Sequence, residues 1–364
     1  MTDLLFAAYT MPGIEDIAWL EIREHLPQAQ FVDKLFVKEQ NGVVLFQYGG
    51  PMEALSQLRT VENILLVALT IDKVTRGWKD LYRLTDQIAK RVSFGNAVDE
   101  LMAFQRSQNV GGAPTFRVVS RLHGRYEYKR KDLEKSVFKG MKARYPHWQP
   151  VSGHARVELW SHLLGARLIC GFRLTDGAKR LKKSEEMKGT LRPSIAAAMI
   201  HLTEPEASDR FLDPMSGSGT LLMARRVAGP YHQLLGGDID AGATGNTRLN
   251  VQQMRKERPS SFTACQLDAA HLPFATGTID KVATNLPFGK QIGSQRRTKK
   301  LYHTFFAELA RVLKENGRAV IFSSEYELVK TAVRKQLQLT ILTGYSIASK
   351  GHWGRIYIIR RDPD

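Results

Sequence analysis

One segment, FLDPMSGSGTLL at residues 211–222, constrains the fold of this chain more than any other. It begins with the end of a short apolar run that predicts a buried strand, and Asp213-Pro214 stops that strand. Gly217 and Gly219 then bracket a tight turn, after which the sequence resumes with helical propensity. A strand, a glycine turn and a helix N-terminus in this order predict a nucleotide-binding corner, because glycines let the backbone approach a ligand that faces the first helical amides.

The residues of this corner narrow the class of ligand. A dinucleotide fingerprint, G-x-G-x-x-G, lacks its third glycine because Leu222 stands there, and the Lys-Ser/Thr pair of a P-loop is absent. Asp213 instead precedes the turn, where a carboxylate would repel a pyrophosphate and attract a cation. S-adenosylmethionine carries a sulfonium and an ammonium group and no phosphate, so we predict it as the ligand. An ordinary strand-to-helix turn is the alternative.

The charge balance indicates a polyanionic partner. Lys and Arg number 53 against 36 Asp and Glu, the net charge is +17, and the isoelectric point is near 9.8. Nucleic acid is the polyanion that such an excess favours, and an incidental basic surface is the alternative. Two cysteines are too few for a disulfide framework or a zinc site, so no metal is expected.

The apolar runs and the first residues bear on the compartment. No uninterrupted apolar run approaches the roughly 18 residues that suggest a membrane span. The N-terminal stretch MTDLLFAAYTMPGIED lacks the basic region of a signal peptide. We therefore expect a soluble, cytoplasmic protein, with two or three domains in its 364 residues.

Residues 4–174 show alternating strand and helix patterns of the α+β type, with a helix expected at 78–92 and a loop at 97–114. Residues 121–144 hold nine Lys and Arg against three acids, and tyrosines lie between the bases. Cations interleaved with aromatic rings suit phosphate contacts and stacking on unpaired bases, whereas a solvated helix face is the alternative. The expected RNA contacts in this half are Arg117, Arg121, Arg125, Tyr126, Lys129, Arg130 and Lys135.

Two further predicted strands beyond the glycine corner also end in acids. Asp238 follows the second strand and is placed to accept hydrogen bonds from both ribose hydroxyls of a nucleoside. Asp268 follows the third strand and can accept from the exocyclic amine of adenine. Three acids that close successive strands are hard to explain as separate turn residues. The expected cofactor contacts are Asp213, Pro214, Ser216, Gly217, Gly219, Thr220, Asp238, Ile239, Asp268, Ala269 and Asn285.

The fourth predicted strand delivers a second motif, Asn285-Leu286-Pro287-Phe288, whose residues we expect to be catalytic. The Asn285 side chain and the Leu286 carbonyl offer two acceptors, while proline stiffens the turn and phenylalanine presents a flat apolar face. Such a set suits a planar base with an exocyclic amine, whose nitrogen would be aimed at the sulfonium methyl. A basic stretch follows, from which RNA contacts are expected at Lys290, Arg296 and Arg297.

At these motifs the chain resembles the Rossmann-like methyltransferases that use S-adenosylmethionine. More narrowly, it is similar to the THUMP-domain RNA guanine-N2 methyltransferases of the TrmN-like group. DPMSGSGTLL resembles their cofactor loop, GGDID their ribose-binding segment, LDAAHLPF their adenine-binding segment and NLPFG their target-base motif. The stretch TFRVVSRLHGRYEYKRKDLEKSVFKGM resembles a THUMP core.

The resemblance implies an α/β fold with a Rossmann-like methyltransferase domain at residues 191–364, built on a mostly parallel seven-stranded sheet. An α+β ferredoxin-like region at 1–60, a THUMP domain at 61–174 and a linker at 175–190 would precede it. The implied reaction transfers a methyl group from S-adenosylmethionine to the 2-amino group of a guanosine in tRNA, with the THUMP half docking the RNA. We expect a monomer.

Alternatives of other kinds stay open at this point. Amino-methyltransferases more broadly carry proline where Leu286 stands and tyrosine where Phe288 stands, which leaves the identity of the target base open. Within the same fold, a guanine or adenine amine of ribosomal RNA is an alternative target. A glutamine in a protein is a further target, which the basic charge disfavours. A non-catalytic RNA-binding protein with a vestigial cofactor site is disfavoured by the acids that the chain retains.

Overall fold

The computed structural model describes residues 3–37, 41–175, 190–254, 261–287, 295–349 and 352–363. The chain forms two compact units, one of Met1–Thr10 with Ile22–Asp176 and the other of Met11–Glu21 with Gly177–Asp364. Almost all of the expected linker at 175–190 lies outside the described residues. None of the helices in the described part is long and apolar enough to cross a membrane.

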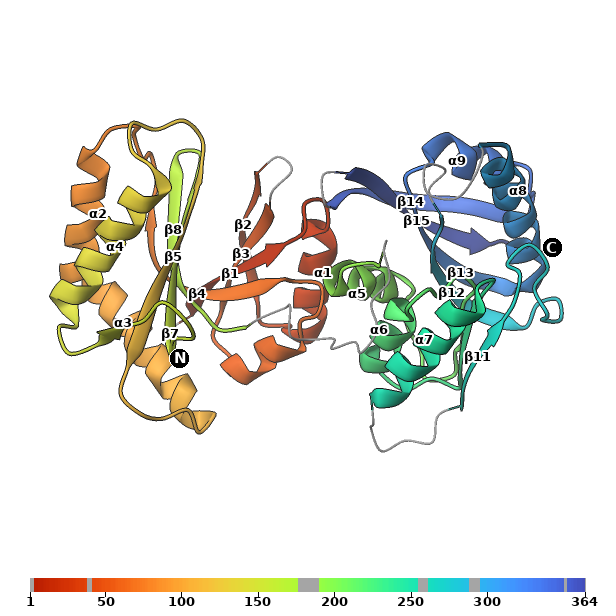
Figure 1. Cartoon of the computed structure of the whole chain (residues 1–364), viewed down its shortest axis with the longest axis horizontal. Helices are drawn as coiled ribbons and strands as arrows, with labels where there is room; N and C mark the ends of the chain where they lie inside the picture. The colour runs from red at the N-terminus through yellow and green to blue at the C-terminus, as the bar shows by residue number, and fades with distance from the viewer. Residues whose placement is uncertain are drawn as a thin grey trace. The chain divides into compact units, whose positions relative to one another are not determined.

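The first unit is built on one sheet, and its described strands are β1 (Leu4–Thr10), β2 (Gln30–Val37), β3 (Asn41–Tyr48), β4 (Asn63–Ile71), β5 (Thr115–His123), β6 (Gln149–Pro150), β7 (Val157–Leu164) and β8 (Arg167–Arg173). They lie in the order β2-β3-β1-β4-β8-β7-β5-β6 (Figure 1). Strand β4 pairs antiparallel with β1 and with β8. The strands of residues 1–60 and 61–174 therefore form one continuous sheet.

Helices cover one face of this sheet in the first unit (Figure 1). They are α2 (Lys79–Lys90), α3 (Val92–Ser107) and α4 (Arg130–Arg144), and a short 3-10 helix, η1, spans Met52–Gln57. Aromatic pairs fix the contact: Phe94 of α3 meets Phe172 of β8 with ring centroids 5.5 Å apart. Phe138 of α4 stacks on Phe116 of β5 at 5.6 Å.

The loop expected at residues 97–114 is wrong over its first part, because α3 continues to Ser107. The single helix expected at 78–92 ends instead at Lys90, and α3 begins two residues later. Gly95 lies inside α3, where a Cβ would lie 2.2 Å from the Arg144 guanidinium. The glycine therefore serves close packing of α3 against the end of α4.

The second unit is built on another sheet, and its described strands are β9 (Arg210–Asp213), β10 (Gln233–Asp238), β11 (Ser261–Gln266), β12 (Ile279–Asn285), β13 (Leu313–Ser323), β14 (Leu339–Ser349) and β15 (His352–Arg361). Their order is β11-β10-β9-β12-β13-β15-β14. The pairings from β11 to β13 are parallel, whereas β15 is antiparallel to both of its neighbours. The carboxyl ends of β9, β10, β11 and β12 therefore meet at one edge.

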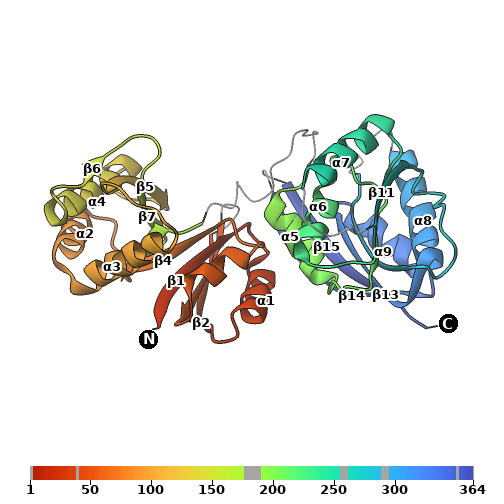
Figure 2. The ribbon, with the colours of Figure 1, turned by 90° about the horizontal axis from the view of Figure 1, so that it is seen from below.

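Helices pack on both faces of this sheet, as Figure 2 shows. They are α5 (Pro193–Leu202), α6 (Thr220–Ala228) and α7 (Ala241–Gln253) on one side, and α8 (Gln295–Val312) and α9 (Tyr326–Arg334) on the other. Successive strand residues enter opposite cores: Phe211 packs with α5 and α6, and Leu212 packs with α8 and α9. The sheet is therefore buried on both faces, as is usual for a parallel sheet that is covered by helices.

A short N-terminal segment belongs to the second unit, although it lies far from that unit in sequence. Ile14 and Ile17, at the start of α1 (Glu15–His25), are fully buried in the core that contains α5. Gly13 has φ +96°, and a Cβ there would lie 1.9 Å from the carbonyl oxygen of Ser346. Only glycine allows this close approach of two backbones.

Candidate active site

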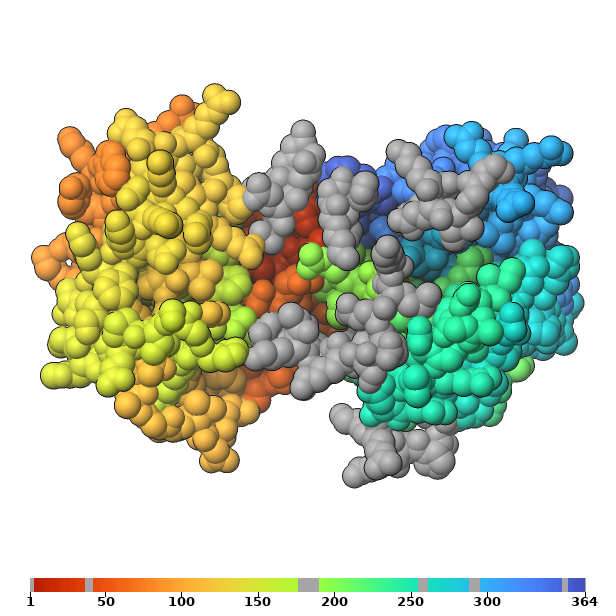
Figure 3. Space-filling view, viewed as in Figure 1, coloured from red at the N-terminus to blue at the C-terminus, as the bar shows by residue number. Residues whose placement is uncertain are grey.

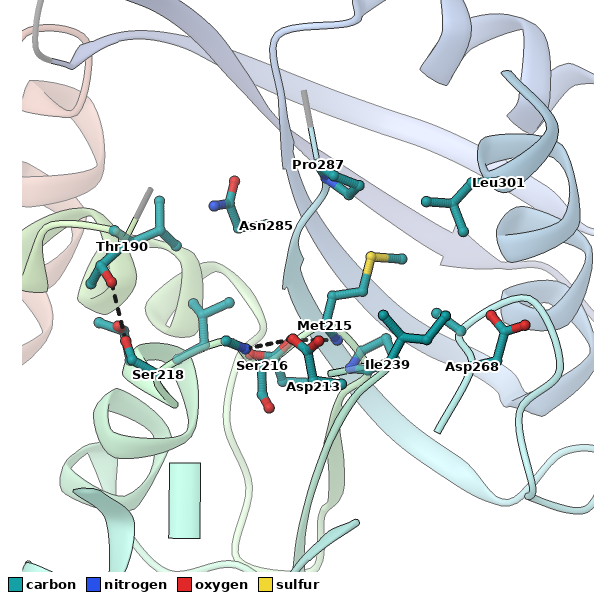
Figure 4. Close-up of a pocket in the computed structure, with 17 residues that line it drawn as sticks. Thr190, Asp213, Met215, Ser216, Ser218, Ile239, Asp268, Asn285, Pro287 and Leu301 are labelled. Atoms are coloured by element: carbon teal, nitrogen blue, oxygen red, sulfur yellow. Dashed lines mark hydrogen bonds between the residues drawn. The ribbon is translucent and has the colours of Figure 1, made fainter. Parts of the chain in front are cut away.

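A cavity of about 340 Å³ lies at the carboxyl edge of the second sheet (Figure 4). Asp213, Asp238 and Asn285 are the last residues of β9, β10 and β12, and Asp268 follows β11. The described residues that line the cavity are Thr190, Leu191, Asp213, Pro214, Met215, Ser216, Gly217, Ser218, Thr220, Leu221, Asp238, Ile239, Asp268, Ala269, Asn285, Pro287 and Leu301. Three carboxyl groups and no Lys or Arg stand among these described residues, so the cavity favours a cationic ligand over a polyphosphate.

The glycine turn forms one wall of the cavity. Gly217 and Gly219 have φ values of +53° and +79°, the left-handed region that L side chains rarely adopt. The Thr247 hydroxyl of α7 donates to the Gly217 carbonyl at 2.9 Å. Gly219 is the residue that precedes α6, so the first amides of α6 face the turn. Gly219 itself does not line the cavity, and its role is to provide the left-handed backbone conformation that the turn needs.

The carboxyl group of Asp213 lies beneath this turn and is almost inaccessible to solvent, with 1% of the residue exposed. The Met215 amide donates to it at 3.3 Å. Burial raises the pKa of Asp213 to about 7, and the neighbouring charge of Asp238 acts in the same direction. A cation bound in the cavity would stabilise the ionised form, because it replaces the solvation that burial removes.

Backbone amides donate hydrogen bonds to the carboxylates of both Asp238 and Asp268. The Gly217 amide donates to one Asp238 oxygen at 2.9 Å, and the Asp240 amide donates to the other at 3.0 Å. The Ala270 amide donates to Asp268 at 2.9 Å. Each carboxylate oxygen has a second lone pair, so both groups can also accept from a ligand.

The cavity wall between these two acids is apolar. Ile239 is 69% exposed although it is a large hydrophobic residue, and it lines the cavity with Ala269. An exposed isoleucine beside two hydrogen-bond acceptors suits one face of a planar, amine-bearing ring such as adenine. The acidic and apolar surroundings therefore fit S-adenosylmethionine.

Asn285 presents an unsatisfied acceptor at the opposite wall. Its side-chain oxygen is buried and has no hydrogen-bond partner among the described residues. Figure 4 shows Asn285 and Pro287 across the cavity from the glycine turn. A buried acceptor without a partner costs free energy, of the order of 1–3 kcal/mol, which a ligand donor would recover. The Leu286 side chain points into the core, and Phe288 lies outside the described residues.

Sequence reasoning missed several lining residues. Met215, Ser218 and Leu221 belong to the glycine segment itself, so their neighbours in sequence were a sufficient signal. Thr190, whose hydroxyl lies 3.2 Å from that of Ser218, was assigned to the linker. Leu301, in α8, carries no motif at all, and only the packing of that helix brings it to the cavity.

The basic residues expected to contact RNA differ in how free their charges are. Arg117 pairs with the buried Glu158 at 2.6 Å, and Arg173 pairs with the same carboxylate at 2.8 Å. Arg121 is also exposed, and its guanidinium lies over the Trp160 ring, 5.7 Å from the ring centroid. Tyr126 donates to the His123 carbonyl at 3.1 Å.

The other cations of this set lie at the surface. Arg125, Lys129 and Lys135 are exposed, and residues 115–145, drawn in yellow shades, form much of the face of the first unit in Figure 3. Arg130 is exposed beside Glu134, at 3.6 Å. In the second unit, Arg296 and Arg297 are exposed in the first turn of α8, whereas Lys290 lies outside the described residues.

No group of three or more His, Cys, Asp or Glu side chains that could hold a metal ion occurs among the described residues.

Comparison with known proteins first defines the class. Residues 180–353 match the UPF0020 family, described as RMKL-like, methyltransferase domain. The crystal structure of TrmN from Thermus thermophilus superposes with a TM-score of 0.78 over 98% of this chain and 99% of that one, at 22% identity. The chain therefore has the Rossmann-like methyltransferase fold that the sequence predicts, and the methyl donor of this class is S-adenosylmethionine.

The names of similar proteins indicate a narrower group within this class of methyltransferases. The tRNA (guanine(6)-N2)-methyltransferase of Archaeoglobus fulgidus is 25% identical over 91% of this chain and 86% of its own length. The human tRNA (guanine(6)-N(2))-methyltransferase THUMP3 is 29% identical over 52% of this chain. This chain covers 39% of the length of that human protein. The resemblance to THUMP-domain guanine-N2 methyltransferases of the TrmN-like group is confirmed.

Proposed function

We propose that this protein transfers a methyl group from S-adenosylmethionine to the exocyclic 2-amino group of a guanosine in tRNA. The names of its relatives support this reaction, and so does a cavity with three carboxyl groups and an unsatisfied acceptor. In this proposal the protein acts as a cytoplasmic monomer without a metal. Residues 1–60 form a ferredoxin-like region, 61–174 a THUMP domain, 175–190 a linker and 191–364 the methyltransferase domain.

The acids at the strand ends would hold the cofactor by its three polar parts. Asp213 lies under the glycine turn and would attract the positive charges of the methionine part. Asp238 would accept from the ribose hydroxyls and Asp268 from the adenine amine, with Ile239 against the ring. When bound, S-adenosylmethionine supplies an electrophilic methyl group.

Asn285 would hold the target nitrogen. In free guanine the lone pair of this nitrogen is delocalised into the ring, so the amine is a weak nucleophile. An oxygen that accepts from the amine can fix its orientation. Holding the nitrogen and the methyl donor together in near-attack geometry is worth on the order of 7–11 kcal/mol in all, of which this contact is one part. A base in a paired region would have to leave its stack, which costs a few kcal/mol. The Leu286 carbonyl and Phe288 are proposed as the second acceptor and the stacking face.

The exposed cations would bind the RNA backbone. Arg125, Lys129 and Lys135 of the first unit are exposed, and we propose that they contact phosphates. Arg296 and Arg297 begin the helix that carries Leu301 to the cavity, so they could contact the nucleotides next to the target.

The observation that carries this proposal is the buried Asn285 oxygen, which has no partner among the described residues and lies in the same cavity as the three acids. To test it, unmodified total tRNA is incubated with methyl-labelled S-adenosylmethionine and digested to nucleosides. We expect label in N2-methylguanosine. Label in an adenosine, label only when ribosomal RNA replaces tRNA, or no label in any RNA would each contradict the proposal.

A further inference from the structure

Tyr302 lies in α8, is fully buried and does not line the cavity, so the proposed function gives it no role. We propose that Tyr302 is a positioning residue for the methyl transfer, because its hydroxyl fixes the turn that carries Asn285. The inference rests on the proposed function and assigns a further residue to the same site.

A chain of three hydrogen bonds runs from the turn through this tyrosine to the residues at the end of β13. The Tyr302 hydroxyl donates to the Pro287 carbonyl at 3.2 Å. The same hydroxyl lies 2.8 Å from the Ser323 hydroxyl, at the end of β13. The Glu325 amide donates to that serine oxygen at 2.9 Å. The turn is therefore linked through one buried tyrosine to the end of the neighbouring strand.

The chemistry of the partners fixes the direction of each bond. The Pro287 carbonyl can only accept, so the single proton of Tyr302 is committed to it. Ser323 must then donate to the tyrosine oxygen, while its own oxygen accepts from the Glu325 amide. Burial holds the pKa of Tyr302 well above its usual range, so the hydroxyl remains a donor at any working pH.

Residue Leu286, in the middle of the turn, is also held by its backbone and by its side chain. The Leu286 amide donates to the Phe322 carbonyl at 3.0 Å, and the Leu286 side chain is fully buried in the core that also contains Tyr302. Leu301, the residue before Tyr302, lines the cavity. Helix α8 thus supplies both a wall of the cavity and the anchor behind its target-binding turn.

The anchor matters because direct methyl transfer depends on near-attack geometry. A misplacement of about 1 Å can reduce such a rate by roughly 100-fold. Without the tyrosine hydroxyl, the Pro287 carbonyl loses its donor, and Asn285, two residues earlier, can shift relative to the three acids. Cofactor binding should survive, because no acid that we assign to the cofactor depends on this network.

The test compares Tyr302→Phe with the matched control Tyr357→Phe. Tyr357 is also buried in the same core, but its hydroxyl has no hydrogen-bond partner among the described residues. We expect Tyr302→Phe to lower kcat for tRNA methylation by roughly 10- to 100-fold. Its KM for tRNA and its Kd for S-adenosylmethionine should stay within about twofold of the control.

A second readout does not depend on activity. Hydrogen exchange of the peptide covering residues 279–287 should be faster in Tyr302→Phe than in Tyr357→Phe. Ser323→Ala should also lower kcat, and it should have no further effect in the Tyr302→Phe background, because the chain of hydrogen bonds is already broken.

Equal kcat values for the two phenylalanine variants would overturn the proposal, and so would unchanged exchange of the turn. A parallel loss of cofactor affinity would also overturn it, since Tyr302 would then support the whole cavity. If the wild-type protein methylates no RNA, the proposed function fails, and the exchange measurement still decides whether the hydroxyl anchors the turn.

Discussion

The cavity of the second unit and the basic surface of the first differ in how their residues are held. Asp213, Asp238 and Asn285 end strands of one sheet, and backbone amides fix both aspartates. Arg125 and Lys129 are instead exposed at the surface of the first unit. We therefore expect the replacement of a single cavity residue to have a large effect on cofactor binding or methyl transfer. The replacement of a single surface cation should have only a small effect on RNA affinity, because many cations contribute to it.

The largest effect is expected at Asn285. Replacing it with alanine removes the buried acceptor, and we expect kcat to fall by on the order of 100- to 1,000-fold, comparable to the loss of one transition-state hydrogen-bond donor or acceptor. The Kd for S-adenosylmethionine, measured by calorimetry, should change by less than about threefold. Activity equal to that of the wild type would remove Asn285 from the reaction.

Asp213→Asn should weaken cofactor binding strongly. The variant keeps the shape of the side chain and removes the negative charge, so we expect the Kd for S-adenosylmethionine at pH 8 to rise by roughly 10- to 100-fold, or about 1.4–2.7 kcal/mol. Isothermal titration measures this directly. An unchanged Kd would mean that the cation is held by other groups.

The pH dependence of cofactor binding tests the role of the Asp213 carboxyl in a second way. Because the Asp213 pKa is about 7 in the free protein, its carboxyl is mostly protonated at pH 6 and mostly ionised at pH 8. Affinity for a cation should therefore rise by about tenfold from pH 6 to pH 8 and then level off. In Asp213→Asn this rise should disappear. A rise that persists in the variant would assign the titration to another group.

The raised pKa of Asp213 affects the stability of the ligand-free protein in the opposite direction, because ionisation of the buried carboxyl is unfavourable when no cation is bound. The folded carboxyl has a pKa above its unfolded value of 3.8, so the folded state binds more protons between about pH 4 and 7. The free energy of unfolding should fall as pH rises through this window. At pH 8, Asp213→Asn should unfold at a higher Tm than the wild type, while it binds the cofactor less tightly.

Replacement of Gly13 tests whether the segment of residues 11–21 packs in the second unit. Gly13→Ala places a methyl group 1.9 Å from the Ser346 carbonyl at a positive φ, so we expect a loss of on the order of 2–4 kcal/mol in unfolding free energy. Thermal unfolding checks this. The control is Gly245→Ala in α7, where a Cβ meets no atom within 4 Å and should stabilise the helix slightly. Equal melting curves would contradict the docking of residues 11–21.

The smallest effect per residue is expected on the basic surface. Neutralising Arg125 and Lys129 together should weaken tRNA binding several-fold and reduce the slope of log K against log salt by about two. Arg117→Gln is the contrasting variant, because an ion pair with the buried Glu158 holds that guanidinium in the protein, and its salt slope should stay close to that of the wild type. If both variants keep the wild-type slope, this surface does not bind the RNA backbone.

Much of the cavity could be predicted from the sequence because its residues sit at the ends of strands. The carboxyl ends of parallel strands meet at one edge, so a strand pattern followed by Asp213, Asp238, Asp268 or Asn285 already suggests a shared position. The structure brings all four to one cavity. The helix α3 was missed because the turn residues Asn109-Val110-Gly111-Gly112, which follow its end at Ser107, made the whole stretch look like a loop.

The sequence by itself determined the class of fold, the acidic cavity and the basic excess, because each depends on residue type and local spacing. Only the tertiary structure decided which groups meet across long separations. It brought Gly13 against Ser346, paired Arg117 with Glu158, and set Tyr302 behind Pro287. Contacts of this kind depend on how helices and strands pack, and no local pattern records that.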